Sequence, residues 1–236
     1  MNSKKENKIA LIMGNNSFIG REYASYLIKE KINFDIIILG KKLKNKIEKK
    51  RTMGIWRPQP QSKILKNRNF YYFDSLNSNT LSKHLKQKRY FLGIQGGGLG
   101  IIKKNIIKNF KIGILNMHPG KLPNYRGSSA PELQVIDGKK IYGSFHLINE
   151  KIDSGKLICS KKLKIDYSSY EIMRSQIYPS MTRNLPNLIK KVLSKKLKFK
   201  NLVEYEKIYL PKKFIGKKMI NKLRLNWDKY SSYATK

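Results

Sequence analysis

Short apolar runs alternate with amphipathic segments along the first half of the chain. Residues 8–14 (KIALIMG) and 34–40 (FDIIILG) are continuous apolar runs that end in glycine, a pattern typical of strands buried on both faces of a sheet. Between them, residues 17–31 carry apolar side chains at helical spacing. This strand–helix–strand order predicts an α/β protein with a Rossmann-like, mostly parallel, twisted sheet and helices on both faces.

The same patterning continues through most of the chain. We predict further strands at 69–73, 90–95, 112–117, 141–148 and 156–165, and helices at 78–88, 101–110, 127–138 and 168–196. Ser78 is placed to cap the first of these helices, in which His84 is expected to be solvated. Pro179 and Pro186 are expected to break or kink the last helix. Residues 41–68 are rich in lysine and are predicted to form a long loop.

The chain of 236 residues carries a formal net charge of +36, from 51 Lys and Arg against 15 Asp and Glu. A balance of this kind often indicates nucleic-acid binding. Here 42 of the basic residues are lysine and 9 are arginine, spread along the whole chain, whereas a dedicated phosphate-binding surface concentrates arginine. Because Asn and Ile are abundant too, we attribute the excess to codon composition and do not expect a nucleic-acid partner.

Composition also limits the other functional classes. The sequence has no run of 18 or more apolar residues, so neither a membrane span nor a membrane partner is expected. Cys159 is the single cysteine, which excludes an internal disulfide and disfavours a cysteine metal site. The start of the chain does not have the pattern of a signal peptide. We therefore expect a cytoplasmic protein with a small-molecule substrate and no metal, and the sequence leaves homodimerisation open.

The most distinctive stretch of the chain is residues 114–127, ILNMHPGKLPNYRG. A rigid polar segment follows an apolar run there, at the predicted C-terminal end of a strand, which is where ligands bind in open α/β sheets. Asn116 and His118 are two positions apart on an extended segment, so their side chains project to the same side. This placement predicts a functional site at the strand end.

Asp153 follows His118 after 35 positions, in the polar loop KIDSGKLI. A histidine, a carboxylate and a side-chain amide form a recurrent catalytic set. The histidine moves a proton, the carboxylate orients the charged ring, and the amide donates a hydrogen bond to a developing oxyanion. In the alternative interpretation, His118 caps a turn and Asp153 is an ordinary loop carboxylate.

Two motifs together favour the catalytic interpretation. NMHPGKLPNYRG, followed at a distance by FHLINEKIDSGKLI, resembles the folate-dependent formyltransferase family. That family carries Asn-x-His-Pro-Ser-x-Leu-Pro-x-Tyr-Arg-Gly, and later a Thr-x-His stretch followed by Asp-x-Gly. The resemblance covers residues 8–195. It implies the formyltransferase fold, with a catalytic domain at 1–195 and a short basic C-terminal extension at 196–236.

The resemblance also implies roles for single residues. Asn116, His118 and Asp153 fall on the catalytic trio of the family, which takes N10-formyltetrahydrofolate as formyl donor and needs no metal. Leu99, Ile101 and Ile102 fall on the segment that holds the pterin ring of the folate.

Candidate acceptor-binding residues are implied at three further places: Asn15 and Ser17 in GNNSFIG (14–20), Tyr125 with Arg126, and His146. The first pair lies where ribonucleotide members bind substrate phosphate at a helix N-terminus. Tyr125 and Arg126 either grip the acceptor or lock their loop, and His146 either contacts the acceptor or supports the structure.

Three positions depart from the family pattern. Gly120 replaces the usual serine, Ser144 stands where threonine is usual, and the run Gln95–Gly98 is richer in glycine than is typical. None of these changes removes a catalytic group, but they leave the shape of the pocket open.

The acceptor implied by the resemblance is a primary amine. The motif version HPGKLPNYRGSSAPE and the basic segment 41–68 are most similar to sugar N-formyltransferases, which act on amino sugars linked to nucleotide diphosphates. Glycinamide ribonucleotide is the alternative acceptor, since that transformylase is close in size. Too few residues follow the catalytic part for the barrel domain of the tRNA members. A catalytically silent, basic RNA-binding relative is an alternative of another class.

Overall fold

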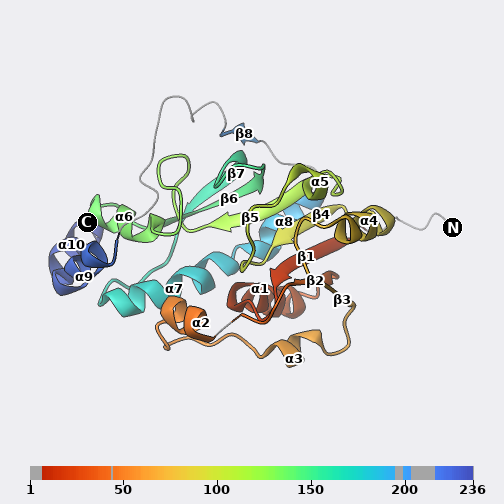
Figure 1. Ribbon diagram of the computed structural model, residues 1–236. Helices are drawn as coiled ribbons and strands as arrows, with labels where there is room; N and C mark the ends of the chain where they lie inside the picture. The colour runs from red at the N-terminus through yellow and green to blue at the C-terminus, as the bar shows by residue number, and fades with distance from the viewer. Residues whose placement is uncertain (1–6, 44, 195–198, 203–215, 236) are drawn as a thin grey trace. The chain divides into compact units, whose positions relative to one another are not determined.

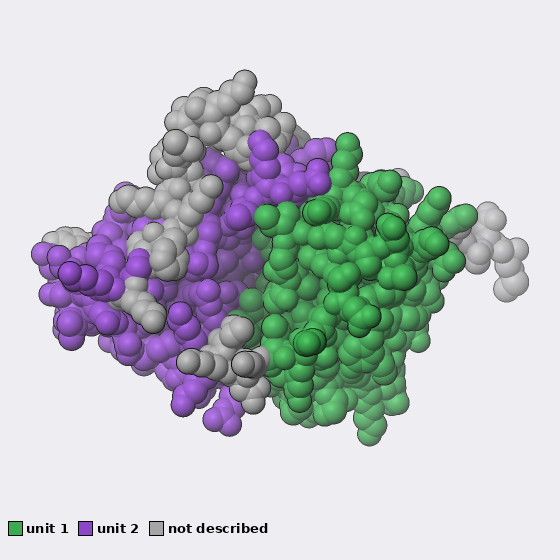
Figure 2. All heavy atoms as spheres, in the orientation of Figure 1, with its two compact units in different colours: residues 1–43, 58–116, 185–197 green, residues 44–57, 117–184, 198–236 purple. Residues whose placement is uncertain are grey.

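We describe a computed structural model of the chain, covering residues 7–43, 45–194, 199–202 and 216–235 (Figure 1). The chain divides into two compact units. Unit 1 comprises residues 1–43, 58–116 and 185–197, and unit 2 comprises residues 44–57, 117–184 and 198–236, coloured green and purple in Figure 2.

Unit 1 is built on parallel strands in the order β3-β2-β1-β4-β5. The strands are β1 (Ile9–Gly14), β2 (Asp35–Leu39), β3 (Phe70–Phe73), β4 (Leu92–Gln95) and β5 (Gly113–His118), the last two residues of which belong to unit 2. All of β1 is buried, as expected for a central strand covered on both faces. The predicted mostly parallel α/β sheet is confirmed.

Helices flank these strands (Figure 1). They are α1 (Phe18–Lys29), α3 (Gln61–Leu65), α4 (Asn79–Lys88), α5 (Lys104–Ile107) and α8 (Leu185–Leu193). Helix α1 packs against β1 and α8, and α4 packs against α5. The predicted cap is confirmed, because the Ser78 hydroxyl accepts a hydrogen bond from the Leu81 amide at 3.2 Å.

Unit 2 contains antiparallel strands in the order β6-β7-β8. They are β6 (Tyr142–Ile148), β7 (Gly155–Lys162) and the short β8 (Lys200–Asn201). The helices of this unit are α2 (Asn45–Thr52), α6 (Ala130–Ile136), α7 (Tyr170–Thr182), α9 (Lys217–Leu225) and α10 (Trp227–Thr235). Helix α2 packs against α7, and α10 packs against α6 and α9.

The prediction of a loop over 41–68 is wrong, because the structure forms α2 and α3 there. Helix α2 has the sequence NKIEKKRT, which offers no apolar stripe from which a helical period can be recognised. Its contact with α7 supplies what the local sequence lacks.

Three smaller expectations also need correction. The helix predicted at 101–110 is reduced to Lys104–Ile107. The helix predicted at 168–196 is interrupted as expected, but after Thr182 and not at Pro179: α7 continues past Pro179, and α8 begins at Leu185, one residue before Pro186. His84 is not solvated, because its ring lies 4.3 Å from the ring centre of Tyr71 and 5.2 Å from that of Phe73. Burial accordingly lowers the pKa of His84.

None of the helices within the described residues has the length and apolar character needed to span a membrane.

Candidate active site

Strand β5 carries the first two candidate residues. Asn116 and His118 occupy alternate positions of this strand, so both side chains leave it on the same side. Asn116 is partly exposed, whereas His118 is 4% exposed. The strand ends at His118, and the loop that follows leads to α6.

Both ring nitrogens of His118 are engaged. Nδ1 lies 3.2 Å from Oδ1 of Asp153, and Nε2 lies 2.7 Å from the backbone carbonyl oxygen of Tyr125. A carboxylate and a carbonyl both accept hydrogen bonds and cannot donate them. Each ring nitrogen therefore faces an acceptor, and a nitrogen bonds to its partner only when it carries the proton.

Asp153 is held in place from a second direction. The backbone N–H of Gly127 donates to Oδ2 of Asp153 at 2.6 Å. The backbone of Asp153 is left-handed, with φ of 48°, a conformation that aspartate tolerates better than most residues. Burial raises the pKa of this carboxyl, but the positive charge and hydrogen bond of His118 and the Gly127 N–H outweigh it. The result is a pKa lowered to about 2, so Asp153 is a carboxylate at neutral pH.

His146, on strand β6, is fully buried. Its Nδ1 donates to the carbonyl oxygen of Ser154 at 3.0 Å. Burial, together with the positive charge of His118, lowers the pKa of His146 to about 4. The ring is thus neutral at neutral pH and does not reach the surface, which favours the supporting role over contact with an acceptor.

Ser144, which stands where threonine is usual, bonds through its hydroxyl to the loop that follows His118. Its hydroxyl donates to the carbonyl oxygen of Gly120 at 2.6 Å and accepts from the N–H of Leu122 at 2.9 Å. It also lies 2.7 Å from the hydroxyl of Ser160. Strands β6 and β7 therefore fix the backbone of the loop that follows His118. The role of Ser160 was not apparent from the sequence, because only the β6–β7 register pairs it with Ser144.

Gly120 stands where serine is usual, and its surroundings leave no space for a side chain. A Cβ atom added there would lie 2.4 Å from the Tyr125 carbonyl oxygen, 2.6 Å from Nε2 of His118 and 2.7 Å from the Ala130 side chain. Contacts this short do not occur at real Cβ atoms, so the observed bond between His118 and Tyr125 requires glycine at this position.

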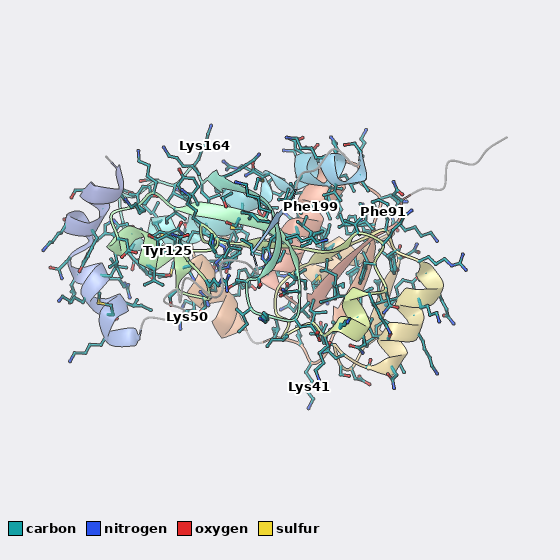
Figure 3. All side chains as sticks on the ribbon, turned by 90° about the horizontal axis from the view of Figure 1, so that it is seen from above. Lys41, Lys50, Phe91, Tyr125, Lys164 and Phe199 are labelled. Atoms are coloured by element: carbon teal, nitrogen blue, oxygen red, sulfur yellow. The ribbon has the colours of Figure 1, made fainter. Side chains whose placement is uncertain are left out.

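Tyr125 and Arg126 take part in the loop structure. The Tyr125 hydroxyl, on the residue labelled in Figure 3, donates to Oδ2 of Asp137 at 3.0 Å. Arg126 is 6% exposed, and its charge is close enough to lower the pKa of His146 further. These contacts favour the loop-locking interpretation.

In unit 1, the candidate phosphate-binding residues bond to the protein itself. The Ser17 hydroxyl donates to the Gly96 carbonyl at 2.7 Å and accepts from the Gly20 N–H at 3.4 Å, which caps α1. The Asn15 side-chain oxygen accepts from Gln61 at 3.1 Å. Ser17 is 1% exposed, so its hydroxyl serves the helix cap in this conformation.

The candidate folate segment has one exposed apolar side chain. Ile101 is 54% exposed and Ile102 is 2% exposed, while Leu99 is partly exposed. Asn77, which sequence reasoning missed, brackets this segment: its side chain donates to the Ile101 carbonyl at 3.0 Å and accepts from the Lys103 N–H at 2.9 Å.

The glycines before this segment have a packing role. A Cβ on Gly97 would lie 2.8 Å from the Ile19 side chain, and φ at Gly97 is 70°. A Cβ on Gly14 would lie 2.5 Å from the Gly98 carbonyl oxygen. The glycine run thus lets the end of β4 approach β1 and α1 closely.

No group of His, Cys, Asp or Glu within the described residues has the arrangement of a metal site. The His118–Asp153 pair with Asn116 is instead suited to proton transfer and to stabilising a developing negative charge.

This chain is similar in sequence to known formyltransferases. Residues 7–182 match the model of the formyl transferase family. A methionyl-tRNA formyltransferase from Finegoldia magna is 35% identical over 94 residues, which cover 39% of this chain and 29% of that protein. The match spans less than a third of the length of the first curated relatives.

Solved structures share the fold over a larger part of the chain. Glycinamide ribonucleotide transformylase 1 from Symbiobacterium toebii has a TM-score of 0.60 at 17% identity, covering 83% of this chain and 91% of that one. An N-formyltransferase from Helicobacter canadensis, in complex with folinic acid and dTDP-3-aminofucose, has a TM-score of 0.60 at 16% identity, covering 88% and 72%.

Proposed function

Since this chain belongs to the formyl transferase family, we propose that it transfers a formyl group from N10-formyltetrahydrofolate to a primary amine. The observation that carries the proposal is the 3.2 Å contact between His118, on the strand that also carries Asn116, and Asp153, in the loop between β6 and β7. Folate donors supply an activated formyl group when bound. The exposed side chain of Ile101 fits such a donor, because it offers apolar surface to an aromatic ring.

Each residue of the pair and the amide has a distinct task in this proposal. As the amine nitrogen bonds to the formyl carbon, negative charge develops on the formyl oxygen, and the Asn116 amide donates a hydrogen bond to it. The His118 ring, with its proton on Nδ1 toward Asp153, takes on Nε2 the proton that the amine loses and returns it to the nitrogen of the leaving group. Asp153 stabilises the charged ring and fixes its orientation.

His118 must exchange one hydrogen bond before it can act. Its Nε2 is bonded to the Tyr125 carbonyl, and Nδ1 faces Asp153. Contact with a substrate through Nε2 therefore requires this nitrogen to leave the carbonyl.

For the acceptor, we propose an amino sugar linked to a nucleotide diphosphate. Support comes from the fold shared with the Helicobacter canadensis enzyme bound to dTDP-3-aminofucose and from the form of the motif at 118–132. The chain's 91% coverage of a glycinamide ribonucleotide transformylase favours glycinamide ribonucleotide as the second candidate. The methionyl-tRNA formyltransferase relative adds aminoacylated tRNA to the acceptors that the experiment must include.

An acceptor screen tests this proposal. Purified protein is incubated with N10-formyltetrahydrofolate and, separately, dTDP-, UDP- and GDP-linked amino sugars, glycinamide ribonucleotide and methionyl-tRNA, and formylated product is measured by mass spectrometry. We expect product with an amino-sugar nucleotide and none with the His118→Asn variant. Product only from one of the other two acceptors would replace the sugar assignment. Salt-dependent RNA binding without folate binding or product would replace formyl transfer itself.

A further inference from the structure

Unit 2 contains a cavity of about 280 Å³ that the proposed reaction does not use. Helices α2, α6, α7 and α9 contribute its walls. Four cationic side chains line it, those of Lys50, Arg51, Arg174 and Arg224, against a single carboxyl, that of Glu132. Lys50 is labelled in Figure 3.

At the wall of this cavity lies a buried ion pair with unsatisfied atoms. Arg174 and Glu132 side chains are each 3% exposed, with Nε and Oε1 3.4 Å apart. The Tyr170 hydroxyl donates to the same Oε1 at 3.1 Å. Nη1 of Arg174 and Oε2 of Glu132 are buried without a hydrogen-bond partner among the described residues. Leaving such groups unpaired is costly, which indicates a ligand that hydrogen-bonds to them.

The charges select an anionic ligand. Four cations against one carboxyl leave an excess of three positive charges when Glu132 is ionised. Burial also raises the pKa of Glu132, although its hydrogen bonds and the charges of Arg51 and Lys50 oppose this. At the rim, Glu171 pairs with Arg224 but does not line the cavity.

Size and donor geometry narrow the class of anion. Whole drug-sized ligands occupy pockets of roughly 300–1,000 Å³, so this cavity suits a smaller group. Guanidinium groups bind phosphate oxygens through paired N–H donors, and three of the four cations are arginines.

We propose that this cavity binds a phosphate or diphosphate group. The cavity is linked to the His118–Asp153 pair through the backbone of residues 127–128. Arg51 donates to the Ser128 carbonyl at 3.4 Å, and the neighbouring Gly127 N–H donates to Asp153. The phosphate belongs either to the acceptor, an assignment that rests on the proposed function, or to a free anion.

Calorimetry with inorganic pyrophosphate at constant ionic strength tests the site directly. We expect saturable binding by the wild-type protein, weakened about tenfold or more in Arg51→Gln and in Arg224→Gln, because each removes a charged donor. Lys49→Gln and Lys222→Gln are matched controls: both residues are exposed, lie on the same two helices, and are absent from the cavity wall. Arg174→Lys keeps the buried charge and removes the unpaired Nη1 donor, so it should also weaken binding.

Two results would overturn the proposal. One is the absence of saturable pyrophosphate binding by the wild-type protein. The other is an equal loss in the control variants, which would mean diffuse attraction to a basic surface.

Kinetics then distinguishes the two sources of the phosphate. If the acceptor supplies it, Arg51→Gln should raise KM for the amino-sugar nucleotide about tenfold with little change in kcat. If the anion is free, KM should stay unchanged while pyrophosphate binding is lost. A protein that binds pyrophosphate as expected but formylates no acceptor refutes the proposed function and leaves this site standing.

Discussion

His118 and Asp153 are 35 positions apart in the sequence, yet Nδ1 of the ring lies 3.2 Å from Oδ1 of the carboxylate. The second carboxylate oxygen takes the Gly127 N–H, and the second ring nitrogen lies against the Tyr125 carbonyl. The pair is therefore fixed at both ends by the loop between β5 and α6.

Breaking this pair should remove turnover without removing the donor site. We expect His118→Asn to lower kcat by about 10²–10⁴, because proton transfer is lost, while binding of a folate analogue measured by calorimetry changes little. Asp153→Asn should lower kcat as well, and the double variant should be hardly slower than His118→Asn alone, since the two residues act as a unit. Full additivity of the two effects would show that they act separately.

Asn116→Ala should lower kcat by about 10²–10³ with a small change in KM, the pattern of a donor whose bond strengthens in the transition state. Asn124→Ala provides the matched control, because Asn124 is an exposed residue of the neighbouring loop. Steady-state kinetics with both substrates varied checks this. A raised KM at constant kcat would assign Asn116 to substrate binding alone.

Stability should depend on pH through His146. Its folded-state pKa of about 4 lies below the ordinary 6.5, so between these values the unfolded chain binds the proton and the folded chain does not. Unfolding free energy should therefore fall as pH drops from 6.5 to 4, by roughly 3 kcal/mol at most from this residue. Above pH 6.5 it should contribute no slope.

Denaturant titrations at several pH values measure this slope, with His146→Gln as the comparison. The variant should be less stable at neutral pH but should lose less stability between pH 6.5 and 4. Asp153 contributes little to this slope. Its pKa is lowered from 3.8 to about 2, so its effect on the unfolding free energy falls mainly below pH 4. Equal slopes in the two proteins would mean that His146 titrates normally.

Gly120→Ala should displace His118. The new methyl group would meet the Tyr125 carbonyl oxygen and the imidazole at 2.4 and 2.6 Å, so we expect a loss of stability of about 1–3 kcal/mol together with reduced kcat. Gly216→Ala is the control, since nothing lies within 4 Å of a Cβ added there and the residue is outside the candidate site. Thermal unfolding and kinetics of the two variants check the prediction. Unchanged kcat in Gly120→Ala would show that the His118–Tyr125 bond is dispensable.

The sequence alone determined the features that depend on local pattern. Strands β1 and β2 are continuous apolar runs. Such runs are stable only when both faces of the strand are buried, so they predict central strands of a covered sheet without reference to the rest of the sequence. The two-residue spacing of Asn116 and His118 likewise sets their common side, because alternation along a strand is a backbone property.

Only the tertiary structure decided the features that depend on distant partners. Helix α2 lacks an apolar stripe and is fixed by contact with α7. His84 looks solvated until Tyr71 and Phe73 of β3 cover it. The pairing of Glu132 with Arg174 joins residues 42 positions apart on two helices. Each of these contacts joins residues that are far apart in the sequence. Which residues meet depends on how the elements pack and on the penalty for burying an unpaired charge, and a local sequence pattern contains neither kind of information.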